Sequence, residues 1–354
     1  MAHLWRGVIE EYREWMPVTS TTVVVTLQEG GTPLVPSAWL SELSSCDVLL
    51  KVEGSNPTGS FKDRGMTVAI SKALEGDAKA VVCASTGNTG ASAAAYAVRA
   101  GMTPIVLVPE GRVAGPKLAQ AVVHGGRIVA VDGSFDDCLR LARGLADEYP
   151  VALVNSLNPH RLAGQKSAAF EVVDAVGDAP DVHVLPVGNA GNISAYWLGY
   201  QQYAAGGRGS RRPRMWGFQA AGAAPIVRGE PVPDPQTVAS AIRIGDPASW
   251  QLAIAARDES GGFIDAVTDE QILSAQRDLS SRDGLFVEPA SAAGVAGLVA
   301  SVADGRLDPG QVVVVTVTGH GLKDVETASA AYGDVRPEVV PADVHAAASA
   351  LGLG

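Results

Sequence analysis

A lysine behind a glycine-rich turn is the first residue whose setting favours chemistry. Lys62 lies in the stretch EGSNPTGSFKDRG (residues 53–65), after two glycines that are five positions apart. A phosphate-binding P-loop needs its lysine directly after the second glycine, but Ser60 and Phe61 intervene here. A lysine at a helix N-terminus faces the positive end of the helix dipole, which disfavours the ammonium and lowers its pKa. Lys62 is therefore predicted to be an amine that attacks a carbonyl carbon, with an ordinary solvated lysine as the alternative.

Two further turns combine glycine with hydroxyl and amide side chains at the expected start of a helix. In Ser85-Thr86-Gly87-Asn88-Thr89-Gly90, glycines let the backbone approach a ligand, and hydroxyls with helix N–H groups can bind a carboxylate. Gly188-Asn189-Ala190-Gly191-Asn192 has the arrangement of an anion-binding nest. A plain N-cap explains only one hydroxyl of the first turn, and a tight turn without a ligand is the alternative for the second.

A fourth polar segment follows a very apolar strand near the C-terminus. Thr318 stands at the carboxyl end of this strand, where ligands of α/β sheets bind and where its hydroxyl could meet a ring nitrogen. His320 suits a general base or a structural hydrogen bond, and no Gly-x-Ser-x-Gly elbow supports Ser–His catalysis. A nucleophilic lysine, a carboxylate cradle, a phosphate nest and an uncharged ring partner together indicate pyridoxal 5′-phosphate, held by Lys62 as a Schiff base.

Alternating strands and helices are expected to position these turns. Short apolar runs predict strands at Val48–Val52, Ala80–Ala84, Pro104–Val108, Arg127–Val131, Val151–Val154, Val182–Pro186, Met215–Gln219 and Val312–Val317. Helical patterns cover Phe61–Ala73, Gly90–Ala100, Pro116–His124, Phe135–Glu148, Arg161–Val176 and Ala190–Gln202. This alternation predicts an α/β protein with mostly parallel twisted sheets flanked by helices.

The composition limits the classes of protein to consider. The 27 basic and 38 acidic residues give a net charge of −11, so a nucleic-acid partner, which needs a basic face, is not expected. No run approaches the ~18 apolar residues of a membrane span, and the N-terminus lacks a signal-peptide pattern. The three cysteines are scattered, so neither disulfides nor a metal site is predicted. We expect a soluble, cytoplasmic protein.

With these motifs the chain resembles the tryptophan-synthase-β family of pyridoxal-phosphate enzymes, the fold type II group, and within it the threonine synthases. The resemblance covers most of the chain, from EGGTPL at residues 29–34 to TGHGLK at residues 318–323. TGSFKDRG at residues 58–65 and the turn at residues 85–90 carry the family resemblance. The narrower resemblance rests on three segments, which are NSLNPHRLAGQK (155–166), GNAGN (188–192) and AIRIGDP (241–247).

The resemblance implies conversion of O-phospho-L-homoserine and water into L-threonine and phosphate. Lys62 would be the Schiff-base lysine and proton carrier, Asn88 would hydrogen-bond the phenolic oxygen of the cofactor, and Thr318 would pair with its pyridine nitrogen. The cofactor phosphate is assigned to Gly188, Asn189, Ala190, Gly191 and Asn192. The substrate is assigned to two sets of side chains, namely Ser85, Thr86 and Thr89 for its α-carboxylate and Asn155, Ser156, Arg161 and Lys117 for its phosphate.

The resemblance also implies a two-lobed architecture. Residues 1–49 and 158–354 would form the large domain, which binds the cofactor. Residues 50–157 would form a smaller α/β domain that carries Lys62 and the carboxylate-binding turn, with the cofactor in the cleft between the lobes. A homodimer is implied by the family, although no residue pattern indicates it.

Three alternative functions are each disfavoured by one feature of the sequence. A threonine or serine dehydratase is the nearest, but the cation and amides of residues 155–166 suit a second phosphate that a dehydratase substrate lacks. A catalytically silent binding protein on the same scaffold would not need Lys62. An ATP-binding P-loop protein is disfavoured by the spacing of that lysine.

Overall fold

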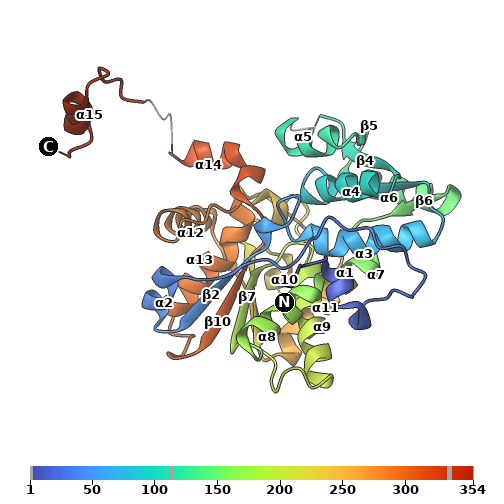
Figure 1. Cartoon of the computed structure of the whole chain (residues 1–354), viewed down its shortest axis with the longest axis horizontal. Helices are drawn as coiled ribbons and strands as arrows, with labels where there is room; N and C mark the ends of the chain where they lie inside the picture. The colour runs from blue at the N-terminus through green and yellow to red at the C-terminus, as the bar shows by residue number, and fades with distance from the viewer. Residues whose placement is uncertain (1–2, 112–114, 333–336, 354) are drawn as a thin grey trace.

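Two sheets covered by helices form the framework of the computed structural model, which describes residues 3–111, 115–332 and 337–353 (Figure 1). One sheet has six strands in the order β1-β2-β10-β7-β8-β9, and the other has four in the order β5-β4-β3-β6. Within these ranges every neighbouring pair of strands is parallel except β1 and β2. The predicted α/β class with mostly parallel sheets is confirmed.

The larger sheet consists of β1 (Leu34–Pro36), β2 (Asp47–Val52), β7 (Val182–Pro186), β8 (Arg214–Ala220), β9 (Phe263–Val267) and β10 (Val312–Val317). One face is covered by α2 (Ala38–Ser44), α12 (Asp269–Arg282) and α13 (Pro289–Ala303), and the other by α1 (Val8–Glu11), α8 (Ser167–Val176), α9 (Gly191–Ala205) and α11 (Trp250–Glu259). Val313 and Val315 pack toward the first face and Val314 toward the second. Because both faces are buried, β10 is apolar along its length.

The smaller sheet consists of β3 (Ala80–Ala84), β4 (Thr103–Pro109), β5 (Arg127–Val131) and β6 (Val151–Leu153). Helices α3 (Lys62–Glu75), α4 (Asn88–Arg99) and α5 (Gly115–Val123) pack on one face, and α6 (Phe135–Glu148) packs on the other. The domain boundary predicted at residue 50 falls inside β2, which pairs with β10 of the larger sheet. The sheets therefore place the change of lobe after this strand.

The remaining elements are short. They are α7 (Pro159–Gln165), α10 (Pro225–Arg228), α14 (Val325–Tyr332), α15 (Val344–Ala350) and the 3-10 helices η1 (Arg13–Trp15), η2 (Glu53–Ser55), η3 (Ser240–Ile242) and η4 (Gly321–Lys323). The single helix predicted over Arg161–Val176 is two helices, α7 and α8, separated at Lys166. Helix α15 stands apart from both lobes (Figure 1).

Helices α3 and α7 cross with their backbones in contact. A Cβ atom added at Gly164 of α7 would lie 1.9 Å from the carbonyl oxygen of Arg64, and one added at Gly65 of α3 would lie 2.7 Å from that of Arg161. Only glycine allows so close an approach, because any side chain would overlap the opposite backbone. The crossing brings the helix that begins with Lys62 directly against the helix that carries Arg161.

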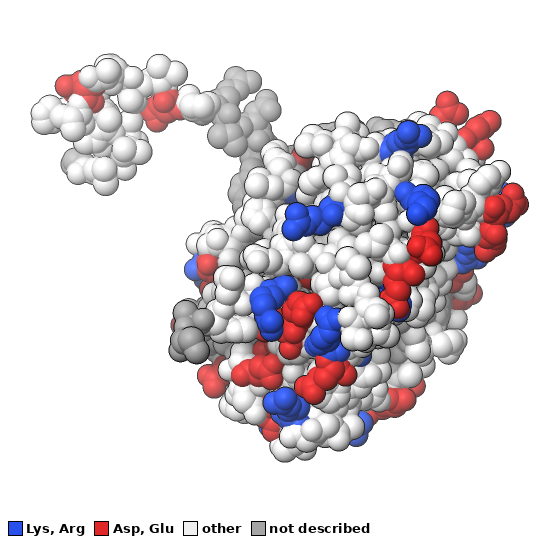
Figure 2. Space-filling model, turned by 45° about the vertical axis from the view of Figure 1, so that its right-hand side comes forward, with Lys and Arg blue, Asp and Glu red and all other residues white. Residues whose placement is uncertain are grey.

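The surface shows charges of both signs. On the face drawn in Figure 2, the described Lys and Arg side chains are interspersed with Asp and Glu. None of the helices in the described ranges is both long and apolar enough to cross a membrane.

Candidate active site

The candidate site lies where the carboxyl end of β10 meets the start of α3. The Phe61 N–H donates to the carbonyl oxygen of Thr318 at 3.0 Å, and the His320 N–H donates to that of Gly59 at 2.9 Å. Ser60 and Gly319 form an isolated antiparallel bridge between the same segments. These backbone contacts fix the first turn of α3, and with it Lys62, beside the last residues of the central strand.

Lys62 is the first residue of α3, and its side chain is half-buried. Burial and, to a smaller extent, the positive charge of Arg161 lower its pKa to about 7, and the carboxylate of Glu288 acts in the opposite direction. The direction agrees with the sequence-based expectation, but burial and Arg161 are the main causes rather than the helix dipole. About half of the amines are therefore unprotonated at neutral pH, which suits attack on a carbonyl carbon.

The turn between β3 and α4 leaves two hydroxyls available. The Ser85 hydroxyl oxygen accepts from the N–H groups of Gly87 at 3.2 Å and Gly90 at 3.0 Å, so this side chain shapes the turn itself. Thr86 and Thr89 are half-buried, and within the described part of the chain their hydroxyls form no hydrogen bond. These two hydroxyls therefore fit a carboxylate better than that of Ser85 does.

The turn at residues 188–192 combines a strained backbone with an unpaired donor. Ala190 adopts a left-handed conformation, with φ of 63°, directly before α9. Such a conformation costs about 1–2 kcal/mol for a residue with a Cβ atom and is common at ligand sites. The side-chain nitrogen of Asn192 is buried without a hydrogen-bond partner at the start of this helix. An anionic phosphate oxygen at the helix N-terminus would satisfy that donor, so the turn fits the phosphate of the predicted cofactor.

Asn189 contributes to this turn in a different way. Its side-chain oxygen accepts from the Ala248 N–H at 2.6 Å, and its side-chain nitrogen donates to the Ser156 hydroxyl. Asn189 therefore holds the turn in place with its side chain. The bond also joins the segment predicted for the cofactor phosphate to a residue predicted for the substrate phosphate.

Thr318 is buried at the end of β10, and its hydroxyl lies 2.8 Å from that of Ser291. Ser291 also accepts from the Gly319 N–H at 2.8 Å. A hydroxyl held in this way can donate to, or accept from, a ring nitrogen, but it carries no charge. His320 is exposed, and its ring accepts from the Leu322 N–H at 3.1 Å, which is a structural contact.

The residues predicted for the substrate phosphate differ in their availability. Arg161 is fully buried, yet its guanidinium makes one long hydrogen bond, 3.3 Å to the carbonyl oxygen of Val154, and its Nε and Nη2 atoms have no partner. Asn155 is occupied, since its amide exchanges two hydrogen bonds with the backbone of Ala84, at 3.0 and 2.9 Å. The side chain of Lys117 lies outside the described residues. Among the described residues predicted for the substrate phosphate, Arg161 is thus a cation with free donors.

Arg161 owes its position to the cap of α7. The Asn158 side chain accepts from the His160 N–H at 2.9 Å, and Pro159 occupies the first helical turn. This arrangement begins the helix two residues before Arg161. The sequence NPHR thus explains why the guanidinium projects from the start of α7 into the interior.

Two residues at the start of α13 were not predicted. Glu288 is buried and accepts from the side-chain nitrogen of Asn88, and Ser291 contacts Thr318. A weak signal is present in the segment EPAS (288–291), which places a carboxylate and a hydroxyl around a proline that begins a helix. The contacts join positions that are 200 and 27 residues apart.

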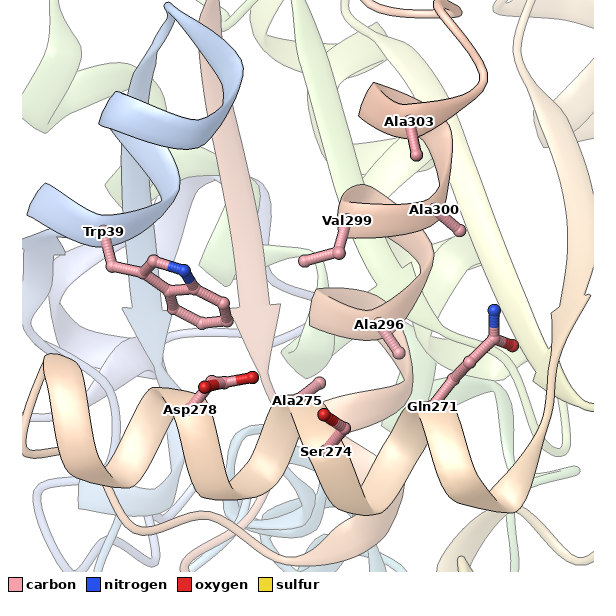
Figure 3. A pocket seen from close by; sticks show the side chains of 9 residues that line it. All are labelled: Trp39, Gln271, Ser274, Ala275, Asp278, Ala296, Val299, Ala300 and Ala303. Atoms are coloured by element: carbon pink, nitrogen blue, oxygen red, sulfur yellow. The ribbon is translucent and has the colours of Figure 1, made fainter.

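A separate cavity of about 260 Å³ lies between α2, α12 and α13. Figure 3 shows that Trp39, Val299 and Gln271 line it, and no side chain of the candidate site does. This cavity is therefore distinct from the site around Lys62.

Comparison with known protein families agrees with the cofactor that was predicted for this site. The family model for pyridoxal-phosphate dependent enzymes matches residues 25–319. The chain belongs to this family, and its cofactor is pyridoxal 5′-phosphate, for which the buried donor of Asn192 and the amine of Lys62, with its lowered pKa, are suited.

Individual relatives within this family are similar to the chain over nearly its whole length. The threonine synthase of Mycobacterium leprae is 57% identical and aligns over 99% of this chain and 97% of its own length. The threonine synthase of Synechocystis sp. is 53% identical over 99% of this chain and 91% of its own. Serine racemase from maize has the same fold, with a TM-score of 0.74 at 21% identity over 89% of this chain and 94% of its own.

Proposed function

We propose that the protein is a threonine synthase, which converts O-phospho-L-homoserine and water into L-threonine and phosphate. The observation that carries this proposal is Arg161, a buried cation that forms no ion pair among the described residues and whose charge lowers the pKa of the Lys62 amine. A substrate with a phosphate on its γ-carbon would satisfy that cation, whereas threonine and serine have no such group. The threonine synthases that align with nearly the whole chain support the same activity.

The chain's own groups divide the binding of the substrate between its two ends. The hydroxyls of Thr86 and Thr89 and the N–H groups at the start of α4 hold the α-carboxylate. The guanidinium of Arg161 binds the phosphate with charge-assisted hydrogen bonds, and the Ser156 hydroxyl contributes from the same side. Lys62 would then act on the carbons between the two ends.

Asn88, Thr318 and the turn at residues 188–192 hold the cofactor, which supplies the electron sink for loss of protons from Cα and Cβ. Lys62 removes the proton at Cα, and proton loss at Cβ expels phosphate from Cγ. Lys62 then returns a proton to Cγ, which becomes the methyl group, water adds its hydroxyl at Cβ and gives its other proton to a base, and Lys62 finally returns a proton to Cα. The pKa of about 7 lets this amine both accept and donate protons near neutral pH.

A combined product assay tests this function. The purified protein, loaded with pyridoxal phosphate, is incubated with O-phospho-L-homoserine, and threonine and phosphate are measured together. Equimolar release is expected from the wild type and from Lys72→Ala, a control on the same helix whose lysine pairs with Glu75. Lys62→Ala should release neither. Formation of ammonia and an oxoacid from threonine or serine, without phosphate release, would instead assign the protein to the dehydratases.

Three broader properties are expected from the proposed function and the family resemblance. The enzyme acts as a homodimer, and it works in the cytoplasm, where amino-acid precursors are made. The cofactor lies between the smaller and larger lobes. Light scattering during size-exclusion chromatography tests the dimer, since a mass near 36.3 kDa would show a monomer instead.

A further inference from the structure

Glu288 faces Asn88 across the candidate cofactor site. Its two carboxylate oxygens lie 3.0 and 3.1 Å from the side-chain nitrogen of Asn88, and the residue is only 5% exposed. A Cβ atom at Gly319 would lie 2.3 Å from one of these oxygens. Glycine at that position therefore leaves the space that the carboxylate occupies.

No cation neutralises this carboxylate directly. Among the described residues Glu288 forms no ion pair within 4 Å, and the amide of Asn88 is its only side-chain hydrogen-bond partner. The groups that act on it from a greater distance are Lys62, Lys323 and Asp324. A buried carboxylate is costly, so its retention here calls for a specific task.

A carboxylate and a carboxamide differ in what they can exchange. An ionised carboxylate only accepts hydrogen bonds, whereas the carboxamide of Asn88 donates from one end and accepts at the other. Both oxygens of Glu288 accept from the nitrogen end of that side chain. Without Glu288 the carboxamide could rotate by half a turn and present its oxygen, which would repel an oxygen of the cofactor.

We propose that Glu288 is a positioning residue that fixes the carboxamide of Asn88 with its N–H toward the phenolic oxygen of pyridoxal phosphate. The inference rests on the cofactor site and is independent of the substrate. Ser291, three residues further along the same helix, holds Thr318 in the same manner. The first turn of α13 thereby orients both polar side chains assigned to the ring of the cofactor.

A double-mutant cycle on cofactor affinity tests this role without any substrate. The dissociation constant of pyridoxal phosphate is measured by absorbance titration of the apoprotein for the wild type, Glu288→Ala, Asn88→Ala and the double variant. Glu288→Ala should weaken binding about tenfold when Asn88 is present, because about one hydrogen bond to the cofactor is lost. The same change should have at least a fivefold smaller effect in the Asn88→Ala background.

A matched control uses the same helical turn. Ser291 contacts Thr318 and not Asn88, so the effect of Ser291→Ala on cofactor affinity should be equal in both backgrounds. Glu288→Gln, whose side-chain oxygen still accepts from Asn88, should recover part of the lost affinity, and it gives a second measurement if the alanine variant is unstable. An effect of Glu288 substitution that is the same with and without Asn88 would overturn the proposal. Failure of threonine formation with this coupling intact would overturn the proposed reaction alone.

Discussion

Two fully buried arginines, on two helices that cross, have opposite surroundings. Arg64 pairs with Glu53 at 2.7 Å and with Glu171 at 2.6 Å. Arg161 has only the carbonyl oxygen of Val154 at 3.3 Å. Burial lowers the pKa of Arg161 to about 10, whereas the two glutamates outweigh burial and raise the pKa of Arg64. Within the described residues Arg64 is neutralised by two carboxylates whereas Arg161 forms no ion pair, and we propose that Arg161 binds an anionic group of the substrate.

The surroundings of Arg64 extend the comparison. Burial alone would raise the pKa of Glu171, but Arg64 and Lys51 lower it to about 2. The Lys51 ammonium lies 2.6 Å from that carboxylate. This cluster ties α3 to β2 and α8, so the charges of Arg64 are used within the fold. A structural cation and a ligand-binding cation can thus be told apart by counting their partners.

The largest expected effect is a difference in the free energy of unfolding between variants of the two arginines. Arg64→Leu leaves Glu53 and Glu171 buried without their main partner and should lower the free energy of unfolding by about 3–5 kcal/mol. Arg161→Leu removes a charge that forms no ion pair among the described residues and on which Asp63 acts only from a distance, so stability should be unchanged or higher. Chemical denaturation of the two variants measures both values. Equal losses would show that the proposed division between them is wrong.

The second effect concerns activity. Arg161→Gln should lower kcat/KM for O-phospho-L-homoserine about a hundredfold or more, since a charge-assisted contact to phosphate is worth about 2–5 kcal/mol. Arg140→Gln, which changes an exposed arginine paired with Asp137, serves as the control and should retain activity. A variant of Arg161 with normal kcat/KM would remove the basis for its role in binding phosphate.

The third effect is a shift in pH dependence. Formation of the Schiff base in the apoprotein requires neutral Lys62, so its rate should rise with pH around a midpoint near 7. Removing the positive charge of Arg161 should move that midpoint upward, while burial and Glu288 remain. Stopped-flow absorbance at each pH measures this midpoint.

The same shift affects stability. Because the pKa of Lys62 is lowered from 10.5 in the folded state, the unfolded chain binds more protons between pH 7 and 10.5, and the free energy of unfolding should rise with pH across this window.

The smallest expected effect is stabilisation of the enzyme against heat by inorganic phosphate, a product of the proposed reaction. Inorganic phosphate added to the holoenzyme should raise its melting temperature by about 1–3 °C at ten times its dissociation constant. Arg161→Gln should abolish this increase, although the cofactor phosphate site is filled in both proteins. Thermal unfolding followed by circular dichroism gives the shift, and an unchanged shift in the variant would contradict binding at Arg161.

Much of the framework was predictable because buried parallel strands leave a continuous apolar pattern. The predicted bounds of β3, β5, β7 and β10 agree with the structure. Strand β1 was missed because it has three residues, and α13 was missed because a helix buried on most sides, rich in alanine and glycine, lacks an amphipathic pattern.

In the candidate site, too, local sequence patterns reveal some features and miss others. The turns that contain Lys62, Asn88 and Thr318 could be found because each follows or begins a regular element. The partner of Asn88 and the use of Asn155 by the backbone of Ala84 could not, since these contacts join residues 200 and 71 positions apart. A sequence pattern can identify a polar side chain, but tertiary contacts decide whether that side chain is still available.

The glycine contact between α3 and α7 has a consequence for substrate choice. Lys62 and Gly65 lie on one face of α3, three residues apart, and Arg161 and Gly164 are related in the same way on α7. The relative position of Lys62 and Arg161 is therefore fixed in part by two backbones that touch. We expect this crossing to limit the length of the substrate that fits between the two side chains.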